Sequence, residues 1–314
     1  MKGSRIVITG GAGFIGSHLA ERLAGQNEVR IVDDFSSGLL DNIKGIRSKV
    51  KVAKKDISNL NGIKNEFKGC DTVFHFAANP DVSLGSRNNS LHLTKDVVGT
   101  YNVLESARLN DVDTVVFASS STVYGEAKVI PTREDYSPML PISFYGASKL
   151  AGEAYMSAFS DNYGMRVVLL RFANIIGPRN GHGVVYNFVK QMNEKGAMTI
   201  LSDGSQKKSY LYVDDCVNGS LIAANKAPKG CSAYNVGSED SITVMEIART
   251  VAKEMGMKAR FVFGSNWAGD VHHFELSVSK LKKLGWRPAC ASAESVRLTA
   301  KHLIVSGSRN ARAR

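Results

Sequence analysis

The sequence predicts an α/β protein built on a doubly wound parallel sheet, with a smaller C-terminal region beside it. Short apolar runs of β-forming residues alternate with segments of helical periodicity through the first half of the chain, and this alternation specifies parallel strands joined by right-handed crossovers. The segment 6–18 passes from an apolar run through closely spaced glycines into a helical pattern, which starts a βαβ unit. With 314 residues, 43% of them hydrophobic, the chain is long enough for one large α/β domain and a smaller one.

The glycine turn near the N-terminus predicts a dinucleotide site. Gly10, Gly13 and Gly16 stand three positions apart, and the helical pattern begins with Phe14 and Ile15. Positions without a side chain let the backbone turn sharply, approach a pyrophosphate and pack the helix on the sheet. The N-terminus of that helix faces the phosphates, where negative charge is favoured. Glycines also punctuate ordinary loops, but here strand, turn and helix follow in order.

An acidic pair after the next apolar run indicates which dinucleotide binds. The run 29–32 ends in Asp33 and Asp34, near the spacing at which a carboxylate reaches the adenosine ribose. A carboxylate there accepts a hydrogen bond from the 2′-hydroxyl of NAD and repels the 2′-phosphate of NADP. We therefore expect NAD as the cofactor. The alternative is an aspartate that only caps a helix or a turn.

Further strands are expected where apolar runs recur, at 50–53, 72–76, 114–118 and 167–170, with helices between them. In sheets of this kind ligands bind at the carboxyl ends of the strands. The segments that follow these strands are therefore candidates for the site. They are 56–57, 76–78, 119–124 and 172–174.

Helical patterns over 91–109 and 143–159 predict long helices. Each helix uses one apolar face to pack on the sheet. If a second apolar face remains, the two helices would pair with a partner subunit through it; the alternative is that this face is buried within one subunit. Shorter helices are expected over 185–194, 214–225, 244–255 and 293–305. We assign residues 1–173 to a Rossmann-type NAD-binding domain with a return segment near 208–237, residues 174–207 and 238–305 to a substrate-binding region, and residues 306–314 to a disordered tail.

Charge and cysteine content exclude several classes of protein. The formal net charge is +11, of which three units come from Arg309, Arg312 and Arg314 in the tail. This balance suits an anionic small molecule, and without a basic run interleaved with aromatic residues no nucleic-acid partner is expected. The four cysteines are scattered, and neither a signal peptide nor a membrane-length apolar run is found, so we expect a cytoplasmic protein without membrane attachment. His272 and His273 are adjacent and cannot easily share one metal, so no metal site is expected.

Tyr145 and Lys149 form the candidate catalytic pair. They stand one helical turn apart, on the same face of the helix expected over 143–159. A lysine there, together with the positive nicotinamide of NAD⁺, would stabilise the phenolate and lower the pKa of the tyrosine toward neutrality, as a general base requires. A hydroxyl from the serine run 119–121 could then bridge the tyrosine and the substrate oxygen.

The spacing alone does not identify the pair. Tyr124 with Lys128 and Tyr186 with Lys190 stand equally far apart. Position favours Tyr145, because it opens a helix shortly after a strand end. A surface tyrosine and lysine that merely flank a helix are the alternative.

Taken in order, these motifs resemble the extended short-chain dehydrogenase/reductase family, and within it the UDP-glucose (UDP-galactose) 4-epimerases. The likeness runs from residue 3 to about 304. Its motifs are TGGAGFIG at 9–16, HFAAN at 75–79, SSSTVYG at 119–125, YxxxK at 145–149, RxxNxxGPR at 171–179, YVDD at 212–215, NVG at 235–237 and LGW at 284–286.

The resemblance implies a site residue by residue. The catalytic triad would be Ser120, Tyr145 and Lys149. NAD would be held by Gly10, Gly13, Phe14, Ile15, Gly16, Asp33, Asp34, Ser37, Gly38, Asp56, Ile57, Phe76, Ala77, Ala78, Tyr145, Lys149 and Phe172. The UDP-sugar would contact Ser120, Thr122, Tyr145, Asn174, Asn187, Lys208, Asp270 and Phe274, with Asn187 near the uracil.

The reaction that the resemblance implies is a hydride transfer that reverses itself. In such enzymes a tyrosinate removes the 4-hydroxyl proton, hydride passes from C4 to NAD⁺, the 4-keto sugar rotates, and hydride returns to its other face. Related dehydratases carry acids at the positions of Ser121 and Thr122, and decarboxylases carry one at that of Thr122. This chain has no acidic residue at either position, so the group that would act as acid or base in an elimination reaction is absent from these positions.

Two positions depart from the family pattern. Lys208 stands where an arginine is common, and Trp267 stands where another arginine precedes Asp270 by three residues. A lysine is a point charge and does not form the bidentate fork of an arginine on a phosphate. Lys207, Lys208 or Arg179 could take over this contact.

We therefore expect a homodimeric enzyme that interconverts UDP-galactose and UDP-glucose. The alternatives are a UDP-uronate 4-epimerase or another C4-modifying enzyme, and a non-catalytic NAD-binding scaffold, against which the intact triad argues. By family likeness, the bulk of Phe274 decides whether an N-acetyl group fits as the sugar rotates, so UDP-N-acetylglucosamine should be a poor substrate. Alternatively, Phe274 is a core residue that anchors a strand together with Leu276 and Val278.

Overall fold

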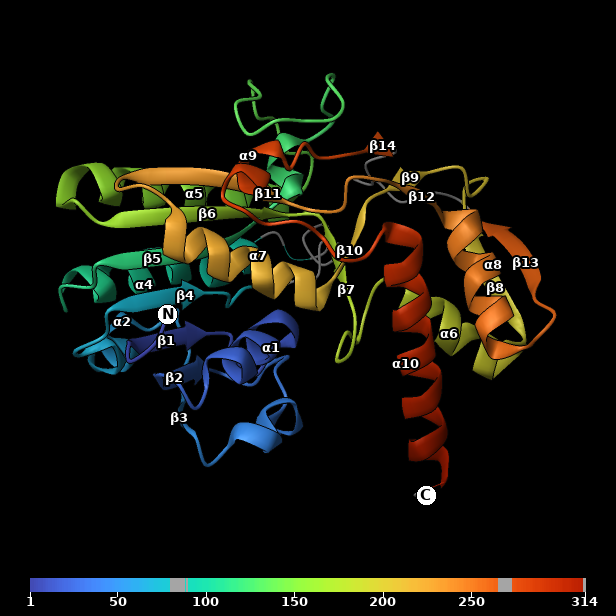
Figure 1. Ribbon diagram of the computed structural model, residues 1–314, viewed down its shortest axis with the longest axis horizontal. Coiled ribbons are helices and arrows are strands. Elements are labelled where there is room, and N and C mark those ends of the chain that lie inside the picture. The colour runs from blue at the N-terminus through green and yellow to red at the C-terminus, as the bar shows by residue number, and fades with distance from the viewer. Residues whose placement is uncertain (80–87, 89, 265–272, 313–314) are drawn as a thin grey trace.

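Seven parallel strands form the sheet at the centre of the larger domain (Figure 1). The computed structural model of the protein describes residues 1–79, 88, 90–264 and 273–312. The strands are β1 (Arg5–Thr9), β2 (Glu28–Asp33), β3 (Val50–Lys54), β4 (Thr72–His75), β5 (Thr114–Ser120), β6 (Arg166–Phe172) and β11 (Cys231–Val236). Their order across the sheet is β3, β2, β1, β4, β5, β6 and β11, and each neighbouring pair is parallel.

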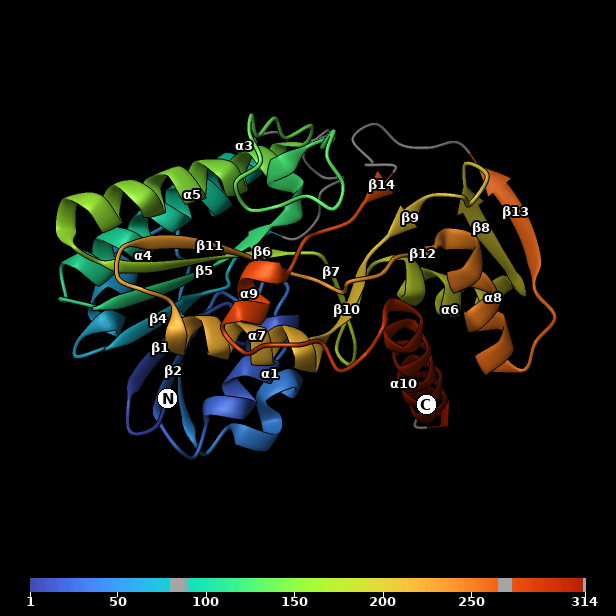
Figure 2. The ribbon, with the colours of Figure 1, turned by 45° about the horizontal axis from the view of Figure 1, so that its top comes forward.

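Helices cover both faces of the sheet (Figure 2). Helix α1 (Phe14–Leu23) packs with α7 (Val213–Lys226) on one face, and α4 (Gly99–Arg108) packs with α5 (Phe144–Tyr163) on the other. Alternate residues of one strand enter two separate cores, with Ile6 and Ile8 in one and Val7 in the other. Burial on both faces is why these strands are continuous apolar runs. The expected doubly wound sheet is confirmed.

The helical pattern over 91–109 forms three elements instead of one helix. These are α3 (Ser90–His92), the π-helical turn η4 (Leu93–Val98) and α4. A π turn adds a residue to the hydrogen-bonded ring and so rotates the side chains that follow it. The expectation of one regular helix was wrong for this reason, and the turn lies beside the candidate site.

Short elements complete the larger domain, and two helices are longer than expected. Helix α5 continues to Tyr163, and α10 (Ser292–Arg312) continues past Val305 to Arg312. The short elements are η1 (Leu40–Ile46), α2 (Leu60–Ile63), η2 (Lys64–Phe67) and η5 (Ser121–Tyr124).

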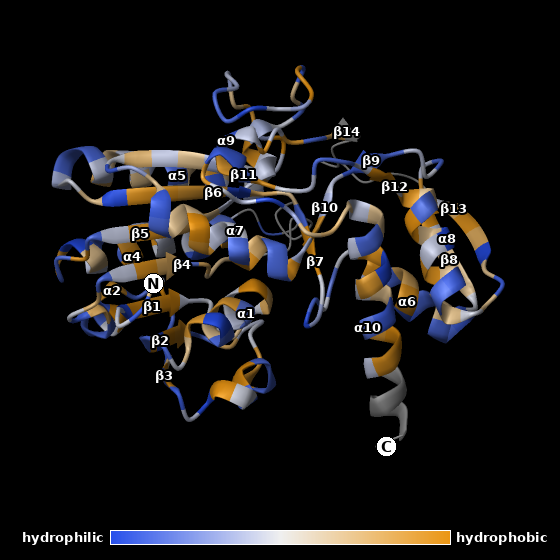
Figure 3. Cartoon of the chain, viewed as in Figure 1, coloured by the Kyte–Doolittle hydropathy of each residue, from blue (hydrophilic) through white to orange (hydrophobic). Residues whose placement is uncertain are grey.

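The C-terminal region has a core of its own, beside the carboxyl ends of the strands. Apolar faces of α6 (Val184–Lys195), α8 (Val244–Met255) and α10 meet there, and Figure 3 shows hydrophobic and hydrophilic residues alternating along these helices. Short strands pair around it: β7 (Asn174–Ile176) with β10 (Tyr210–Tyr212), β8 (Ala197–Leu201) with β13 (Arg260–Gly264), and β9 (Lys207–Lys208) with β12 (Ile242–Thr243) and β14 (His273–Phe274).

The chain returns from this region to the sheet. After β10, helix α7 packs on the sheet and β11 pairs with β6 at its edge, and the short helix α9 (Ser279–Lys283) contacts β11. Within the described ranges, no helix is both long and apolar enough to cross a membrane.

The direction in which strands are added reverses between β1 and β4, and the turn after β1 lies directly against the end of β4. A β-carbon built on Gly10 would lie 2.6 Å from the backbone nitrogen of Ala77, and Gly10 has a φ of +70°. Crevices at such reversal points bind ligands. The site is therefore expected where these two backbones meet.

We predict that Gly10→Ala lowers the free energy of unfolding more than Gly25→Ala does. Gly25 has a φ of +89° with no other atom of the described chain within 4 Å of its added β-carbon. Its replacement should therefore cost only the left-handed conformation, roughly 1–2 kcal/mol. Gly10→Ala should cost roughly 1–3 kcal/mol more, because the backbone of Ala77 must move. Urea unfolding measures both, and equal losses would contradict the close-approach argument.

Candidate active site

Ser120, Tyr145 and Lys149 come together at the carboxyl end of β5. Ser120 ends the strand and is 8% exposed, and its side chain lies close enough to the Tyr145 hydroxyl to lower the pKa of the phenol. The side chain of Ser143 caps α5 by accepting a hydrogen bond from Gly146, which places Tyr145 on the first turn. Lys149 is buried, and its Nζ donates to the backbone carbonyl of Ala118 at 2.8 Å and lies 5.7 Å from the centre of the Tyr145 ring.

The protein alone does not favour a tyrosinate at this site. Burial raises the pKa of the Tyr145 phenol, the carboxylate of Asp96 raises it further, and the hydrogen bond from Ser120 lowers it. Burial also lowers the pKa of Lys149 to about 8, against the opposing influence of Asp96 and Glu153. The lowered tyrosine pKa expected from the sequence therefore requires the positive charge of the nicotinamide in addition to Lys149.

Tyr124 belongs to a buried structural network instead. Its hydroxyl donates to Oδ1 of Asn235 at 2.7 Å and accepts from Arg171 at 2.9 Å. Arg171 also pairs with Glu153 at 2.6 Å, and Glu153 accepts from Ser119 at 2.5 Å. Burial raises the pKa of Tyr124 to about 12. A hydroxyl with both partners in the core cannot serve as a base for a substrate.

The turn expected to hold the pyrophosphate is anchored by Asp33. Its carboxylate accepts from the backbone nitrogens of Ala12 and Phe35, each at 2.9 Å, and the side chain is 6% exposed. Burial raises the pKa of Asp33, and these two hydrogen bonds lower it. Gly13 precedes α1 without a side-chain cap, so N–H groups of the first turn remain for an anion. Asp33 therefore shapes the glycine turn as well as offering oxygen atoms to a ribose.

Lys95 joins the adenosine end of the site, where the sequence indicated only acids. Its Nζ lies 2.5 Å from Oδ2 of Asp56 and 3.5 Å from Oδ2 of Asp34. Hydrogen bonding to Asp56 raises the pKa of Lys95. Burial raises the pKa of Asp56, but Lys95 and the hydrogen bonds from Ser58 together lower it. No local pattern could have indicated this bridge, because Lys95 comes from the π turn.

The other residues assigned to NAD lie along the same edge. Phe76 and Phe172 pack edge to face with ring centres 5.9 Å apart, and the backbone nitrogen of Ala77 donates to Oγ1 of Thr9 at 3.3 Å. The remaining members are partly buried or buried at the ends of β1 to β4, except that Ser37 is exposed: Phe14, Ile15, Ser37, Gly38, Ile57 and Ala78.

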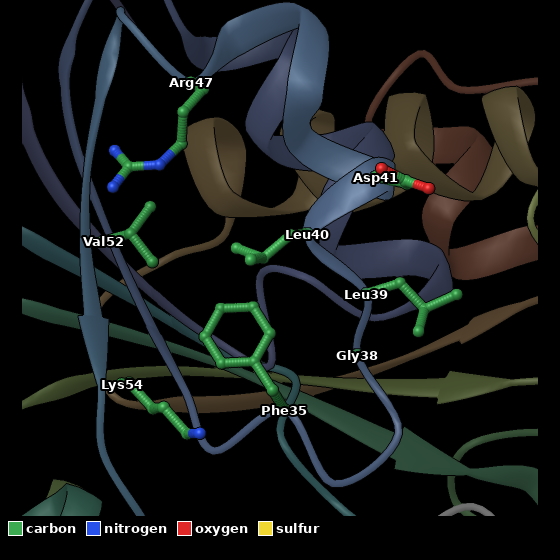
Figure 4. Close-up of a pocket in the computed structure, with 8 residues that line it drawn as sticks. All are labelled: Phe35, Gly38, Leu39, Leu40, Asp41, Arg47, Val52 and Lys54. Atoms are coloured by element: carbon green, nitrogen blue, oxygen red, sulfur yellow. The ribbon is translucent and has the colours of Figure 1, made fainter.

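A pocket of about 560 Å³ lies between η1 and β3, next to this adenosine end (Figure 4). It contains Gly38 of the assigned set and no member of the triad. Its lining is Phe35, Gly38, Leu39, Leu40, Asp41, Arg47, Val52 and Lys54. NAD fits the glycine turn after β1, the N-terminus of α1 and the carboxylate of Asp33. This assignment does not depend on the pocket.

The residues expected to contact the sugar nucleotide are spread over several elements. Thr122 donates from Oγ1 to Ser120 at 3.0 Å, and Asn174 of β7 donates to the carbonyl of Ser209 at 3.1 Å. Asn187 is exposed on α6, and Lys208 lies on β9. Asp270 and Trp267 lie outside the described residues.

Two residues make other contacts: Arg179, offered as a replacement phosphate ligand, and Phe274, expected to limit the space around the sugar. Arg179 pairs with Glu21 at 2.5 Å and donates to Ser17 at 3.1 Å, so its guanidinium is bound to α1 and the suggestion that it clamps the phosphates is not supported. Phe274 is 7% exposed in the same core as Leu276 and Val278, which favours the core interpretation of this residue.

Sequence reasoning missed a buried acid and its partner beside the triad. Asp96 and His92 interact through Oδ2 and Nδ1 at 2.7 Å, and the rings of His92 and Tyr145 lie 5.8 Å apart. Among the residues that the structure describes, no group of three or more His, Cys, Asp or Glu side chains could hold a metal ion.

A Rossmann-type sheet with an anchored glycine turn and a Ser–Tyr–Lys group at its carboxyl edge defines a nicotinamide-dependent enzyme. The chain belongs to the NAD dependent epimerase/dehydratase family, whose model matches residues 6–237. NAD is therefore its cofactor.

Similar proteins cover almost the whole chain. A UDP-glucose 4-epimerase of Mycolicibacterium smegmatis is 34% identical over 306 residues, which span 94% of this chain and 97% of that protein. A crystal structure of a UDP-galactose 4-epimerase is 43% identical with a TM-score of 0.88, and the match covers 96% of this chain and 99% of that one. A UDP-N-acetylglucosamine 4-epimerase of Methanobrevibacter ruminantium is 28% identical with a TM-score of 0.90, over 98% and 100% of the chains.

We predict that Tyr145→Phe and Tyr124→Phe have opposite effects. Tyr145→Phe removes the hydroxyl expected to act as the base and should lower turnover of a nucleotide sugar by about 100-fold or more, with NAD content retained. Tyr124→Phe leaves Arg171 and Asn235 short of a buried partner and should cost roughly 1–3 kcal/mol of stability, with turnover per folded molecule retained. Assays of turnover and urea unfolding on both variants check this. A folded but inactive Tyr124→Phe beside an active Tyr145→Phe would show that Tyr145 is not the base.

Proposed function

We propose that the protein interconverts UDP-galactose and UDP-glucose by transient oxidation at C4 with tightly bound NAD. The observation that carries this proposal is the Ser120–Tyr145–Lys149 group at the end of β5, with no acid at Ser121 or Thr122. Base chemistry through one tyrosine suffices for moving a hydride out and back, whereas elimination needs a further acid or base.

In this mechanism the protein moves one proton. Tyr145 accepts the proton of the sugar 4-hydroxyl and later returns it to the same oxygen. Ser120 lies beside the tyrosine hydroxyl and would orient it, and the Lys149 ammonium, 5.7 Å from the centre of the Tyr145 ring, would favour the phenolate by its charge. NAD held at the glycine turn after β1 and beside Asp33 would supply the acceptor, and then the donor, of the C4 hydride. Burial of Ser120 and Lys149 keeps water away from this proton transfer.

The similar proteins support 4-epimerase activity, but they are named for different sugar substrates. Two of them are named for UDP-glucose or UDP-galactose, at 34% and 43% identity, and one is named for UDP-N-acetylglucosamine at 28%. A UDP-uronate 4-epimerase or another C4-modifying enzyme is the alternative activity. A non-catalytic NAD-binding scaffold is the alternative of another class.

We predict that the purified protein carries bound NAD and converts UDP-galactose without added cofactor, because the hydride that it removes is returned. Rates with UDP-glucuronate and UDP-N-acetylglucosamine should be much lower. A coupled assay with the three sugars measures this. Apo-protein that turns over only with stoichiometric NADP, or a preference for UDP-glucuronate, would contradict the proposal.

Phe274→Gly tests the basis of sugar choice in the same assay. If the ring limits the space around C2, the variant should raise the rate with UDP-N-acetylglucosamine relative to UDP-galactose. Leu276→Ala is the matched control, because it removes apolar volume from the same core. Comparable losses of stability in both variants, without a change in relative rates, would assign Phe274 to the core alone.

We also propose that the enzyme is a homodimer joined through α4 and α5. Exposed aromatic residues gather on these helices, with Tyr101 40% and Tyr155 44% exposed and their ring centres 5.9 Å apart. Apolar surface of this kind marks interaction sites.

We predict that the double variant Tyr101→Glu, Tyr155→Glu is a monomer, because it places two negative charges in the interface. Sedimentation equilibrium should give the mass of a dimer for the wild type and of a monomer for the double variant. The matched control is Phe263→Glu, which places a charge at an exposed aromatic residue on strand β13 of the other region and should leave a dimer. A wild-type monomer, or a double variant that stays dimeric, would refute this interface.

A further inference from the structure

A buried carboxylate lies beside the catalytic pair. Asp96 comes from the π turn η4, and its side chain is 3% exposed. Its Oδ1 accepts from the backbone nitrogen of Asn79 at 2.8 Å, and its Oδ2 accepts from Nδ1 of His92 at 2.7 Å. Oγ of Ser148 lies 3.3 Å from Oδ2 and donates to the backbone carbonyl of Tyr145 at 2.8 Å. Hydrogen-bond donors on both oxygens are what a buried carboxylate needs to remain ionised.

His92 leaves this negative charge uncompensated. The imidazole is 1% exposed and lies edge to face against Tyr145, with ring centres 5.8 Å apart. Its Nε2 is buried and has no hydrogen-bond partner in the part of the chain that the structure describes. An imidazolium would bury an unpaired N–H donor there, so we assign the neutral tautomer with its proton on Nδ1, donated to Asp96.

The position of Asp96 gives its charge two effects on the catalytic pair. The carboxylate raises the pKa of the Tyr145 phenol, which opposes formation of the phenolate. It also raises the pKa of Lys149, which opposes loss of the ammonium. Both effects have one physical origin, because a buried negative charge disfavours a second negative charge and favours a positive one.

The other charged groups nearby do not replace it. Glu153 of α5 raises the pKa of Lys149, but its charge is paired with Arg171 at 2.6 Å. His75 of β4 stays neutral because burial and Lys149 lower its pKa to about 3. Lys95 of the same turn is paired with Asp56 and Asp34. On α4, Glu105 and Arg108 pair with each other.

We propose that Asp96 is a positioning residue of this enzyme, a fixed negative charge that keeps Lys149 protonated and Tyr145 neutral until the positive nicotinamide is bound. His92 fixes the carboxylate without neutralising it. The proposal rests on the proposed function for its kinetic consequence, but not for its effect on the protonation of Tyr145. The site would thus form its base only when the hydride acceptor is present.

The kinetic test is the pH profile of kcat/KM for UDP-galactose. Its acidic limb reports ionisation of Tyr145, and its basic limb reports loss of the Lys149 proton. Asp96→Asn should move both limbs to lower pH by roughly one unit, the size of shift that one nearby charge produces. His92→Phe keeps the carboxylate and should leave both limbs in place. A purely structural role would lower the profile without displacing it, and limbs that move to higher pH in His92→Phe would show a charged His92.

A second readout needs no turnover. Ultraviolet difference absorbance follows tyrosinate formation in the NAD-containing protein as pH rises, and Tyr145→Phe identifies the signal of that residue. Asp96→Asn should ionise Tyr145 at lower pH than the wild type, and Asp161→Asn, an exposed carboxylate at the far end of α5, should not. Asp96→Ser removes the same charge if the amide disturbs the fold.

The two readouts separate the proposals. An unshifted tyrosinate titration in folded Asp96→Asn overturns the role of Asp96. A shifted titration in a protein that does not convert UDP-galactose supports Asp96 and refutes the proposed substrate.

Discussion

The meeting of two backbones at the reversal point of the sheet is the constraint on which the rest of the site depends. Gly10 after β1 lies so close to Ala77 after β4 that a side chain at Gly10 would meet the backbone of the other strand. Asp33 then anchors the same turn to the end of β2 through Ala12 and Phe35. The dinucleotide crevice is therefore part of the packing of the central strands.

A second constraint, the buried ion pair of Arg171 and Glu153, determines which tyrosine is free to act. Removing two charges from water is costly unless each oxygen and N–H group finds a partner. Tyr124 and Ser119 provide such partners, which holds Tyr124 inside the core. Tyr145 lies on α5 outside this network, with its hydroxyl near Ser120, and remains available to a substrate.

The electrostatics of the site follow from burial more than from any single pair. Burial acts against the charged forms of both Tyr145 and Lys149, so a phenolate beside an ammonium is not the resting state of the protein alone. The carboxylate of Asp96 raises the pKa of Tyr145, as burial does, and raises the pKa of Lys149, which burial lowers. The positive nicotinamide of NAD⁺ acts in the opposite direction on the tyrosine, because a nearby positive charge favours the phenolate.

By itself the sequence determined the parallel sheet, the glycine turn, the acid after β2 and the Tyr145–Lys149 pair, because apolar periodicity, side-chain-free turns and one-turn spacing are local properties of a chain. Only the tertiary structure decided that Arg179 is bound to α1, that Phe274 packs in a core, and that Asp96 faces the triad. These contacts depend on a π turn and on packing between elements far apart in sequence, which no local pattern encodes.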